Sequence, residues 1–162
     1  MRRYAYFNWE NGMGLIDLQA KTLRRMDVLA VRWKGERNAT HLATGMRGER
    51  EALFHLRRLG YVVVARRWKT PKLRGDVDLI AWDGEWLCFV EVKTRGSRGV
   101  VTAEAAVDEG KQKMLRRMAR AYLRGFPEAA RKEIPVRFDV VSVYLQPAGI
   151  EFEVQKGAFR WA

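Results

Sequence analysis

Residues 75–95 read GDVDLIAWDGEWLCFVEVKTR, and this stretch decides the fold. Two runs of mostly apolar residues, 77–82 and 86–93, flank the dipeptide Asp83-Gly84. An aspartate-glycine pair between two such runs is a strong signal for a β-hairpin, because glycine adopts the positive φ that a tight turn requires. The stretch therefore predicts two antiparallel strands in the core of a sheet.

The two faces of this predicted hairpin differ in character. One face is apolar and suited to packing beneath a helix: Val77, Leu79, Ala81, Trp86, Cys88, Val90 and Val92. The other face becomes charged away from the turn, where it carries Asp76, Asp78, Glu91 and Lys93. If Asp83 and Gly84 form the turn, Asp78 and Glu91 are diagonal neighbours with backbones about 7–8 Å apart. Buried carboxylates are costly unless they are paired or bind a metal, so this cluster predicts a partner.

Two interpretations of the charged cluster follow from the residues alone. Two carboxylates at this spacing suit Mg²⁺, which completes its oxygen coordination with water and substrate phosphate. Lys93 lies on the same face, where an ammonium group orients water or stabilises charge during phosphodiester hydrolysis. The alternative is a structural ion-pair network of Asp76, Asp78, Glu91, Lys93 and Arg95. The residues leave both interpretations open.

The sequence on either side of the hairpin predicts helices and further strands. Apolar residues at helical spacing predict one helix that begins near Gly48 and ends at Gly60, and another over about 110–124. The remaining predicted segments are a strand at 61–65, a basic loop at 66–74, and strands at 136–144 and 150–154. Arg137 and Asp139 fall on one strand face and are predicted to form a structural pair. The order is typical of an α/β fold.

Length and composition limit the classes of protein that this chain can belong to. Of its 162 residues, we expect 1–38 to form an N-terminal extension, disordered in part, and 39–162 to form one domain. Cys88 is the single cysteine, which excludes a disulfide framework and a CxxC zinc site. No run of about 18 apolar residues occurs, so we expect no membrane span and a cytoplasmic location.

The charge of the chain is strongly positive. It contains 31 Lys and Arg residues against 19 Asp and Glu residues, for a formal net charge of +12. Such an excess favours polyanions through phosphate contacts and counterion release, so nucleic acid is the leading partner. A basic surface that serves solubility, or that meets ribosomes without specificity, explains the same charge. Charge alone names no reaction.

Asp78 followed by Glu91-Val92-Lys93 resembles the D…ExK signature of the restriction-endonuclease-like, or PD-(D/E)xK, nucleases. Further motifs are similar to the bacterial YraN-like family, uncharacterised protein family 0102, over about residues 45–160. These motifs are Gly48-Glu49, Leu59-Gly60-Tyr61, residues 75–80, residues 89–95, Lys111-Gln112 and residues 137–141. The family usually has glutamate at the position of Asp76, so a shorter carboxylate stands beside the site here.

The resemblance implies a restriction endonuclease-like core, with a central mixed β-sheet flanked by α-helices as in archaeal Holliday-junction resolvases. It implies Mg²⁺ or Mn²⁺ as cofactor, Asp78 and Glu91 as metal ligands, and Lys93 as the catalytic lysine. Glu49 is implied as a further metal ligand, and the helix pattern independently places it inward. Glu49 serves the helix dipole in the alternative interpretation. By analogy with resolvases, a homodimer is also expected.

The predicted nucleic-acid contacts lie on the second helix and in the basic loop. They are Lys111, Gln112, Arg116, Arg117, Arg120, Arg67 and Lys69. We predict a metal-dependent endonuclease acting on DNA, including branched or damaged DNA. The first alternative is a non-catalytic nucleic-acid-binding protein that retains the nuclease fold. A structural protein associated with RNA or ribosomes is the second, and the sequence leaves DNA and RNA open as substrates.

Overall fold

The computed structural model describes residues 39–95 and 107–161. The chain divides into two compact units, residues 1–43 and 44–162. The extension predicted at residues 1–38 lies outside the described residues. The second unit contains every strand of the described sequence. Among the described residues, no helix has both the length and the apolar character needed to cross a membrane.

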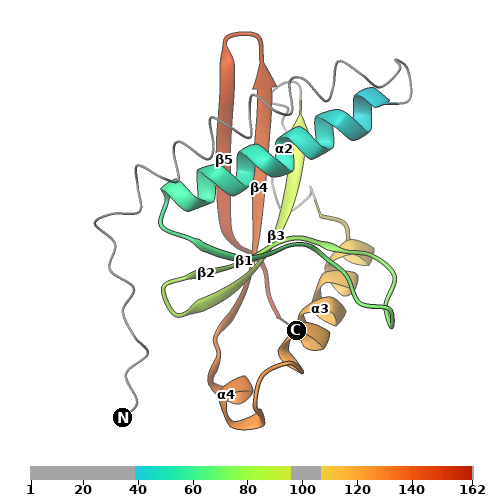
Figure 1. Ribbon diagram of the computed structural model, residues 1–162, viewed down its shortest axis with the longest axis vertical. Coiled ribbons are helices and arrows are strands. Elements are labelled where there is room, and N and C mark those ends of the chain that lie inside the picture. The colour runs from blue at the N-terminus through green and yellow to red at the C-terminus, as the bar shows by residue number, and fades with distance from the viewer. Residues whose placement is uncertain (1–38, 96–106, 162) are drawn as a thin grey trace. The chain divides into compact units, whose positions relative to one another are not determined.

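One five-stranded sheet forms the framework of the second unit (Figure 1). Its strands are β1 (Val62–Trp68), β2 (Val77–Asp83), β3 (Trp86–Arg95), β4 (Val136–Gln146) and β5 (Gly149–Phe159). They lie side by side in the order β1-β2-β3-β4-β5. The β3–β4 pair is parallel and the other three pairs are antiparallel. The predicted α/β class with a central mixed sheet is confirmed.

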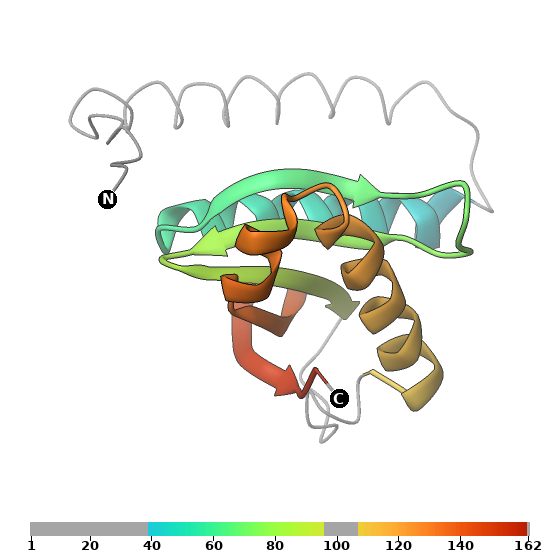
Figure 2. The ribbon, with the colours of Figure 1, turned by 90° about the horizontal axis from the view of Figure 1, so that it is seen from below.

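Helices cover both faces of this sheet. They are α2 (Ala39–Arg58), α3 (Glu109–Leu123) and the short α4 (Glu128–Glu133). Gly48 of α2 lies against Thr94 of β3, whereas Lys111 of α3 contacts Glu91 of β3. Because successive side chains on a strand alternate between faces, α2 and α3 lie on opposite sides of the sheet. Figure 1 shows α2 crossing β5, β4 and β3, and Figure 2 shows α3 on the other side.

The core is buried on both faces of β2 and β3. Toward α3, the largest fully buried side chains include Ile80, Leu87, Phe89, Leu115, Met118 and Phe138. On the other face, the buried residues include Ala52, Leu56, Leu79, Ala81, Cys88 and Val90. The β3–α3–β4 connection explains this arrangement, because parallel strands require a crossover helix that covers one face of the sheet.

The hairpin turn lies one residue further along the chain than predicted. Asp83 pairs with Trp86, so Gly84 and Glu85 are the turn residues, and Gly84 has a φ of 60°. The predicted register was therefore wrong by two residues, although a shift of two keeps every side chain on its predicted face. Leu79 pairs with Val90. The pairing of β2 with β3 ends there, and the N–H of Val92 donates to the side chain of Asp78.

Several helices and strands are longer than predicted. Helix α2 begins at Ala39, nine residues before the predicted start, and β5 continues to Phe159 instead of Val154. Strand β1 includes Arg66, which pairs with Leu79, although the sequence predicted a loop there. Helix α4 was not predicted. These extensions depend on pairing and packing with distant residues, which override weak local propensity.

The predicted helix end at Gly60 is confirmed. Gly60 has a φ of 93°, a conformation that costs glycine little. Its N–H donates to the carbonyl of Arg57 at 3.1 Å, and the N–H of Tyr61 donates to the carbonyl of Leu56 at 3.0 Å. These two bonds form a Schellman motif, which satisfies the last carbonyls of α2 and directs the chain into β1.

Candidate active site

Glu91 lies in the middle strand of the sheet and is 4% exposed. Its Oε1 lies 3.0 Å from Lys93 Nζ, and its Oε2 lies 2.9 Å from Lys111 Nζ. The Oε2 contact lacks hydrogen-bond geometry and is therefore an electrostatic contact. Lys93 reaches Glu91 because residues two apart on a strand share a face. Two ammonium groups from different elements thus hold one buried carboxylate.

Asp78 is the second carboxylate of the site. Its Oδ2 accepts a hydrogen bond from the backbone N–H of Val92 at 2.7 Å. Burial and then the negative charge of Glu91 raise the pKa of Asp78 to about 7, against the lowering effects of the Val92 hydrogen bond and of Lys111. At neutral pH Asp78 is therefore divided between its protonated and ionised forms. A bound cation would favour the ionised form.

Helix α3 positions Lys111 at the site through its N-terminal cap. Asp108 precedes the helix, and its Oδ1 accepts a hydrogen bond from the N–H of Lys111 at 2.8 Å. Burial lowers the pKa of Lys111, but its contact with Glu91 and the charges of Glu91, Asp78 and Asp76 raise it, and the net shift is upward. Lys111 is therefore held in its charged form. Lys111 was predicted to contact phosphate or the active site, and its partner there is Glu91.

Glu49, the predicted third ligand, lies on α2 within electrostatic reach of the pair. Burial raises the pKa of Glu49, and the charges of Asp76 and Glu91 contribute in the same direction. Its Oε2 lies 3.7 Å from Arg67 Nε. Across residues 39–95 and 107–161, no three His, Cys, Asp or Glu side chains are close enough together to hold a metal ion. The geometry therefore offers a carboxylate pair, and the role of Glu49 as a ligand stays a prediction.

Besides Lys111, four of the residues predicted to contact nucleic acid form hydrogen bonds or ion pairs within the protein. Arg67 pairs with Glu49, and Lys69 Nζ lies 3.8 Å from Asp76 Oδ2. The amide of Gln112 donates to the carbonyl of Val107 at 3.0 Å and accepts from Arg116 at 3.3 Å. Arg116 also donates to the carbonyl of Arg160 at 2.9 Å. Gln112 and Arg116 thus fasten the start of α3 and the C-terminal segment to one another.

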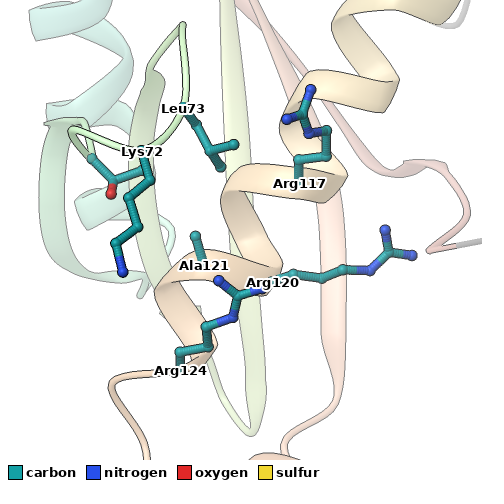
Figure 3. Close-up of a pocket in the computed structure, with 7 residues that line it drawn as sticks. Lys72, Leu73, Arg117, Arg120, Ala121 and Arg124 are labelled. Atoms are coloured by element: carbon teal, nitrogen blue, oxygen red, sulfur yellow. The ribbon is translucent and has the colours of Figure 1, made fainter.

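The other two predicted arginines, Arg117 and Arg120, line a cavity of about 360 Å³ between α3 and the loop that joins β1 to β2 (Figure 3). Its remaining lining residues are Thr70, Lys72, Leu73, Ala121 and Arg124. Thr70, Lys72 and Leu73 belong to the basic loop that was predicted to contact nucleic acid, whereas Ala121 and Arg124 were not predicted as contacts. The spacing of the arginines on α3 predicts that they share one side of the helix. Only the fold shows which loop lies opposite that side.

A second buried polar cluster lies on the α2 side of the sheet. Arg137 forms two hydrogen bonds with Asp139, at 2.8 and 2.9 Å, which confirms the predicted pair. Asp139 is fully buried and also accepts from the N–H of Gly157 at 2.9 Å. Arg137 donates further to Tyr61 and Asp83. These side chains are all bonded within the protein, so the cluster is a structural network that joins Tyr61 to β2, β4 and β5.

Comparison with known proteins gives the relatives of this chain. Residues 48–143 match the sequence model of the uncharacterised protein family UPF0102. A UPF0102 protein of Koribacter versatilis is 50% identical over 119 residues, which cover 74% of this chain and 80% of the relative. One from Solibacter usitatus is 45% identical over 118 residues, covering 71% and 84%. One from Rhodococcus opacus is 42% identical over 107 residues, covering 66% and 86%.

Proposed function

The chain belongs to the uncharacterised protein family UPF0102, and on that premise we propose that it is a metal-dependent nuclease that hydrolyses phosphodiester bonds in nucleic acid. Asp78, Glu91 and Lys93 form its active site within a restriction-endonuclease-like core. One observation carries the proposal. The half-buried Asp78 interacts with the buried Glu91, its pKa is raised to about 7, and Lys93 and Lys111 both contact Glu91. Strongly shifted carboxylates of this kind cluster at functional sites.

The donor set fits a divalent cation. Asp78 and Glu91 repel one another, and Glu91 is buried with only ammonium groups recorded at its two oxygens. A positive charge between them would remove that repulsion and restore the ionised form of Asp78. Asp78 and Glu91 would hold Mg²⁺ or Mn²⁺, with Glu49 as a further carboxylate. When bound, the ion supplies positive charge to the phosphate and lowers the pKa of an attacking water.

The lysines of the site supply the remaining chemistry. An ammonium group has three N–H donors, so Lys93 can contact Glu91 and still donate to water or to a phosphate oxygen. Lys93 in this role orients the nucleophile and stabilises the negative charge that develops on the phosphate. Lys111, whose pKa is raised, provides a second permanent positive charge beside the same carboxylate.

The proposed substrate is DNA, including branched or damaged DNA. The net charge of +12 supports a polyanionic substrate. A homodimer acting in the cytoplasm belongs to the same proposal, and sedimentation of the purified chain with and without DNA tests the dimer.

Cleavage by matched variants tests the nuclease. The substrates are labelled duplex, single-stranded and branched DNA, and RNA. Each is incubated with Mg²⁺ or Mn²⁺ and with one of three proteins: wild type, Glu91→Gln or Glu85→Gln. Glu85 is an exposed carboxylate at the turn of the same hairpin and serves as the control. We expect Glu91→Gln to lose activity on the order of 100-fold or more, and Glu85→Gln to match wild type. Equal cleavage by Glu91→Gln would refute the proposed site.

A second candidate function is nucleic-acid binding without cleavage. The observation that favours it is the pairing of Glu91 with Lys93 and Lys111, which neutralises the carboxylate without a metal. This function predicts no cleavage of any substrate by wild type, together with salt-sensitive binding that is unchanged by Mg²⁺ and by Glu91→Gln. The cleavage assay and a binding titration therefore separate the two candidates.

A further inference from the structure

The cavity between α3 and the β1–β2 loop has an unusual composition of charges. Four of its lining residues are cations, namely Lys72, Arg117, Arg120 and Arg124, and none is acidic. The others are Thr70, Leu73 and Ala121. In Figure 3, Leu73 and Ala121 face the space between loop and helix, and Lys72 and Arg124 lie along one side of it. The cavity therefore combines a partly apolar floor with a cationic rim.

These four cations lack carboxylate partners among the residues that the structure describes. Elsewhere in the same region, cations are paired: Lys69 with Asp76, and Lys93 and Lys111 with Glu91. Arg120 makes a contact of another kind, with its guanidinium 5.4 Å from the centre of the Trp161 ring. Like charges gathered in a concave surface repel one another, and an anion in the cavity would relieve that repulsion.

The spacing of the arginines suits a chain of phosphates. Arg117, Arg120 and Arg124 stand at positions i, i+3 and i+7 and therefore follow one side of the helix. Seven residues of helix rise about 10 Å, which is close to the rise of about three phosphates along one strand of a duplex. A row of cations of this length matches a nucleic-acid strand better than a single small anion.

The helix that lines the cavity also carries a residue of the carboxylate site. A Cβ on Gly75 would lie 2.8 Å from Met114 Sδ, so the end of the β1–β2 loop runs against the first half of α3. Lys111, which contacts Glu91, precedes Arg117 by six residues on that helix, a rise of about 9 Å. Helix α3 thus carries both Lys111 of the carboxylate site and the arginines of the basic cavity.

We propose that this cavity is a phosphate-binding groove that holds the sugar–phosphate backbone of a nucleic-acid strand beside the carboxylate site. The inference rests on the proposed function for the identity of its ligand. Lys72, Arg117 and Arg124 contact successive phosphates, and Arg120, fixed over Trp161, supplies a further positive charge. Such contacts position the strand and do not read its sequence.

Binding measured in EDTA tests the groove without catalysis. The probes are a labelled DNA duplex and an RNA duplex of the same sequence, titrated by fluorescence anisotropy at several salt concentrations. The groove variant is Arg117→Gln/Arg124→Gln. The control is Arg57→Gln/Arg58→Gln, which removes the same charge from the exposed end of α2 on the opposite side of the sheet. The rescue variant is Arg117→Lys/Arg124→Lys.

We expect the groove variant to bind about tenfold more weakly, with a salt slope smaller by about 2, because two phosphate contacts are lost. The control should stay within about threefold of wild type, and the lysine variant should retain most of the binding. Equal losses in groove and control variants would overturn the groove, because net charge alone would then explain binding. Whichever of DNA and RNA shows the larger loss is the strand that the groove holds.

The cleavage assay keeps this inference distinguishable from the nuclease proposal. If wild type cleaves nothing but the groove variant loses binding, the groove stands and the nuclease proposal falls. If wild type cleaves and the groove variant binds as well as wild type, the nuclease stands and the groove falls. Circular dichroism of each variant checks that these exposed substitutions leave the fold intact.

Discussion

At the residue scale, the ionisation of Asp78 links the site to the stability of the fold. Its pKa is raised to about 7, above the ordinary value of 3.8, because it is buried beside Glu91. Folding therefore takes up a proton between these two values. The stabilisation that this uptake provides is present at low pH and is lost as the pH rises through about 7.

Asp78→Asn should remove this dependence in the metal-free protein. Relative to wild type, the variant should gain stability between about pH 5 and pH 8, by a few kcal/mol at most, since each pKa unit corresponds to about 1.4 kcal/mol. Urea unfolding of both proteins in EDTA across this range measures the difference. A difference that stays constant with pH would show that Asp78 is already ionised in acid.

Asp139, in contrast to Asp78, is a carboxylate with a structural role. It is fully buried and accepts hydrogen bonds from Arg137 and Gly157. Asp139→Ala leaves the Arg137 guanidinium without its main partner and should cost about 3–5 kcal/mol of unfolding free energy. Lys132→Ala breaks only an exposed pair with Glu128 and should cost at most about 0.5 kcal/mol. Similar losses for both substitutions in chemical denaturation would contradict the buried network.

At the level of single elements, the packing of α2 against the sheet depends on Gly48. A Cβ on Gly48 would lie 1.8 Å from Thr94 Oγ1 and 2.8 Å from Thr94 Cβ, so α2 touches β3 directly at this point. The same close approach places the neighbouring Glu49 near the carboxylate pair. Packing of this element is therefore part of the site.

Two alanine substitutions on α2 should have opposite effects. Gly48→Ala should destabilise the fold by about 1–3 kcal/mol, because overpacking forces the helix away from β3. Gly45→Ala meets no atom within 4 Å and should stabilise by about 0.5–1 kcal/mol through helix propensity. Thermal unfolding of the two variants gives the comparison. If Gly48→Ala were as stable as Gly45→Ala, the contact with Thr94 would be absent.

At the scale of the whole molecule, the proposed metal site joins several elements. Asp78 belongs to β2, Glu91 and Lys93 to β3, and Lys111 to α3. A cation that binds there binds the folded chain and not the unfolded chain, so it must stabilise the fold by mass action.

Mn²⁺ should therefore raise the melting temperature. At about ten times its Kd, the ion adds about 1.4 kcal/mol, which corresponds to about 3–6 °C for a chain of this size. The rise should be larger at pH 8 than at pH 6, because protons compete for Asp78 below its pKa of about 7. Differential scanning fluorimetry should show the rise in wild type and Glu85→Gln. An equal rise in Glu91→Gln would place the ion elsewhere.

The local features of this protein could be predicted from residue spacing along the chain. Alternating residues in 75–95 predicted the hairpin, its apolar face and the charged end that carries Asp78, Glu91 and Lys93. The end of α2 at Gly60 and the Arg137–Asp139 pair were also predicted correctly. These features depend on spacing within one element, where geometry has a short period and leaves few choices.

Only the tertiary structure decided what distant elements bring together. The hairpin register differs by two residues from the prediction, Asp78 accepts from the N–H of Val92 next to Glu91, and α3 carries Lys111 onto Glu91. Gln112 and Arg116 proved to be engaged inside the protein, while Lys72 and Arg124 line the basic cavity. Such contacts join residues far apart in the chain, and they form because both faces of the sheet must be covered. Periodicity tells which side of an element is buried, but only packing selects the partner that covers it.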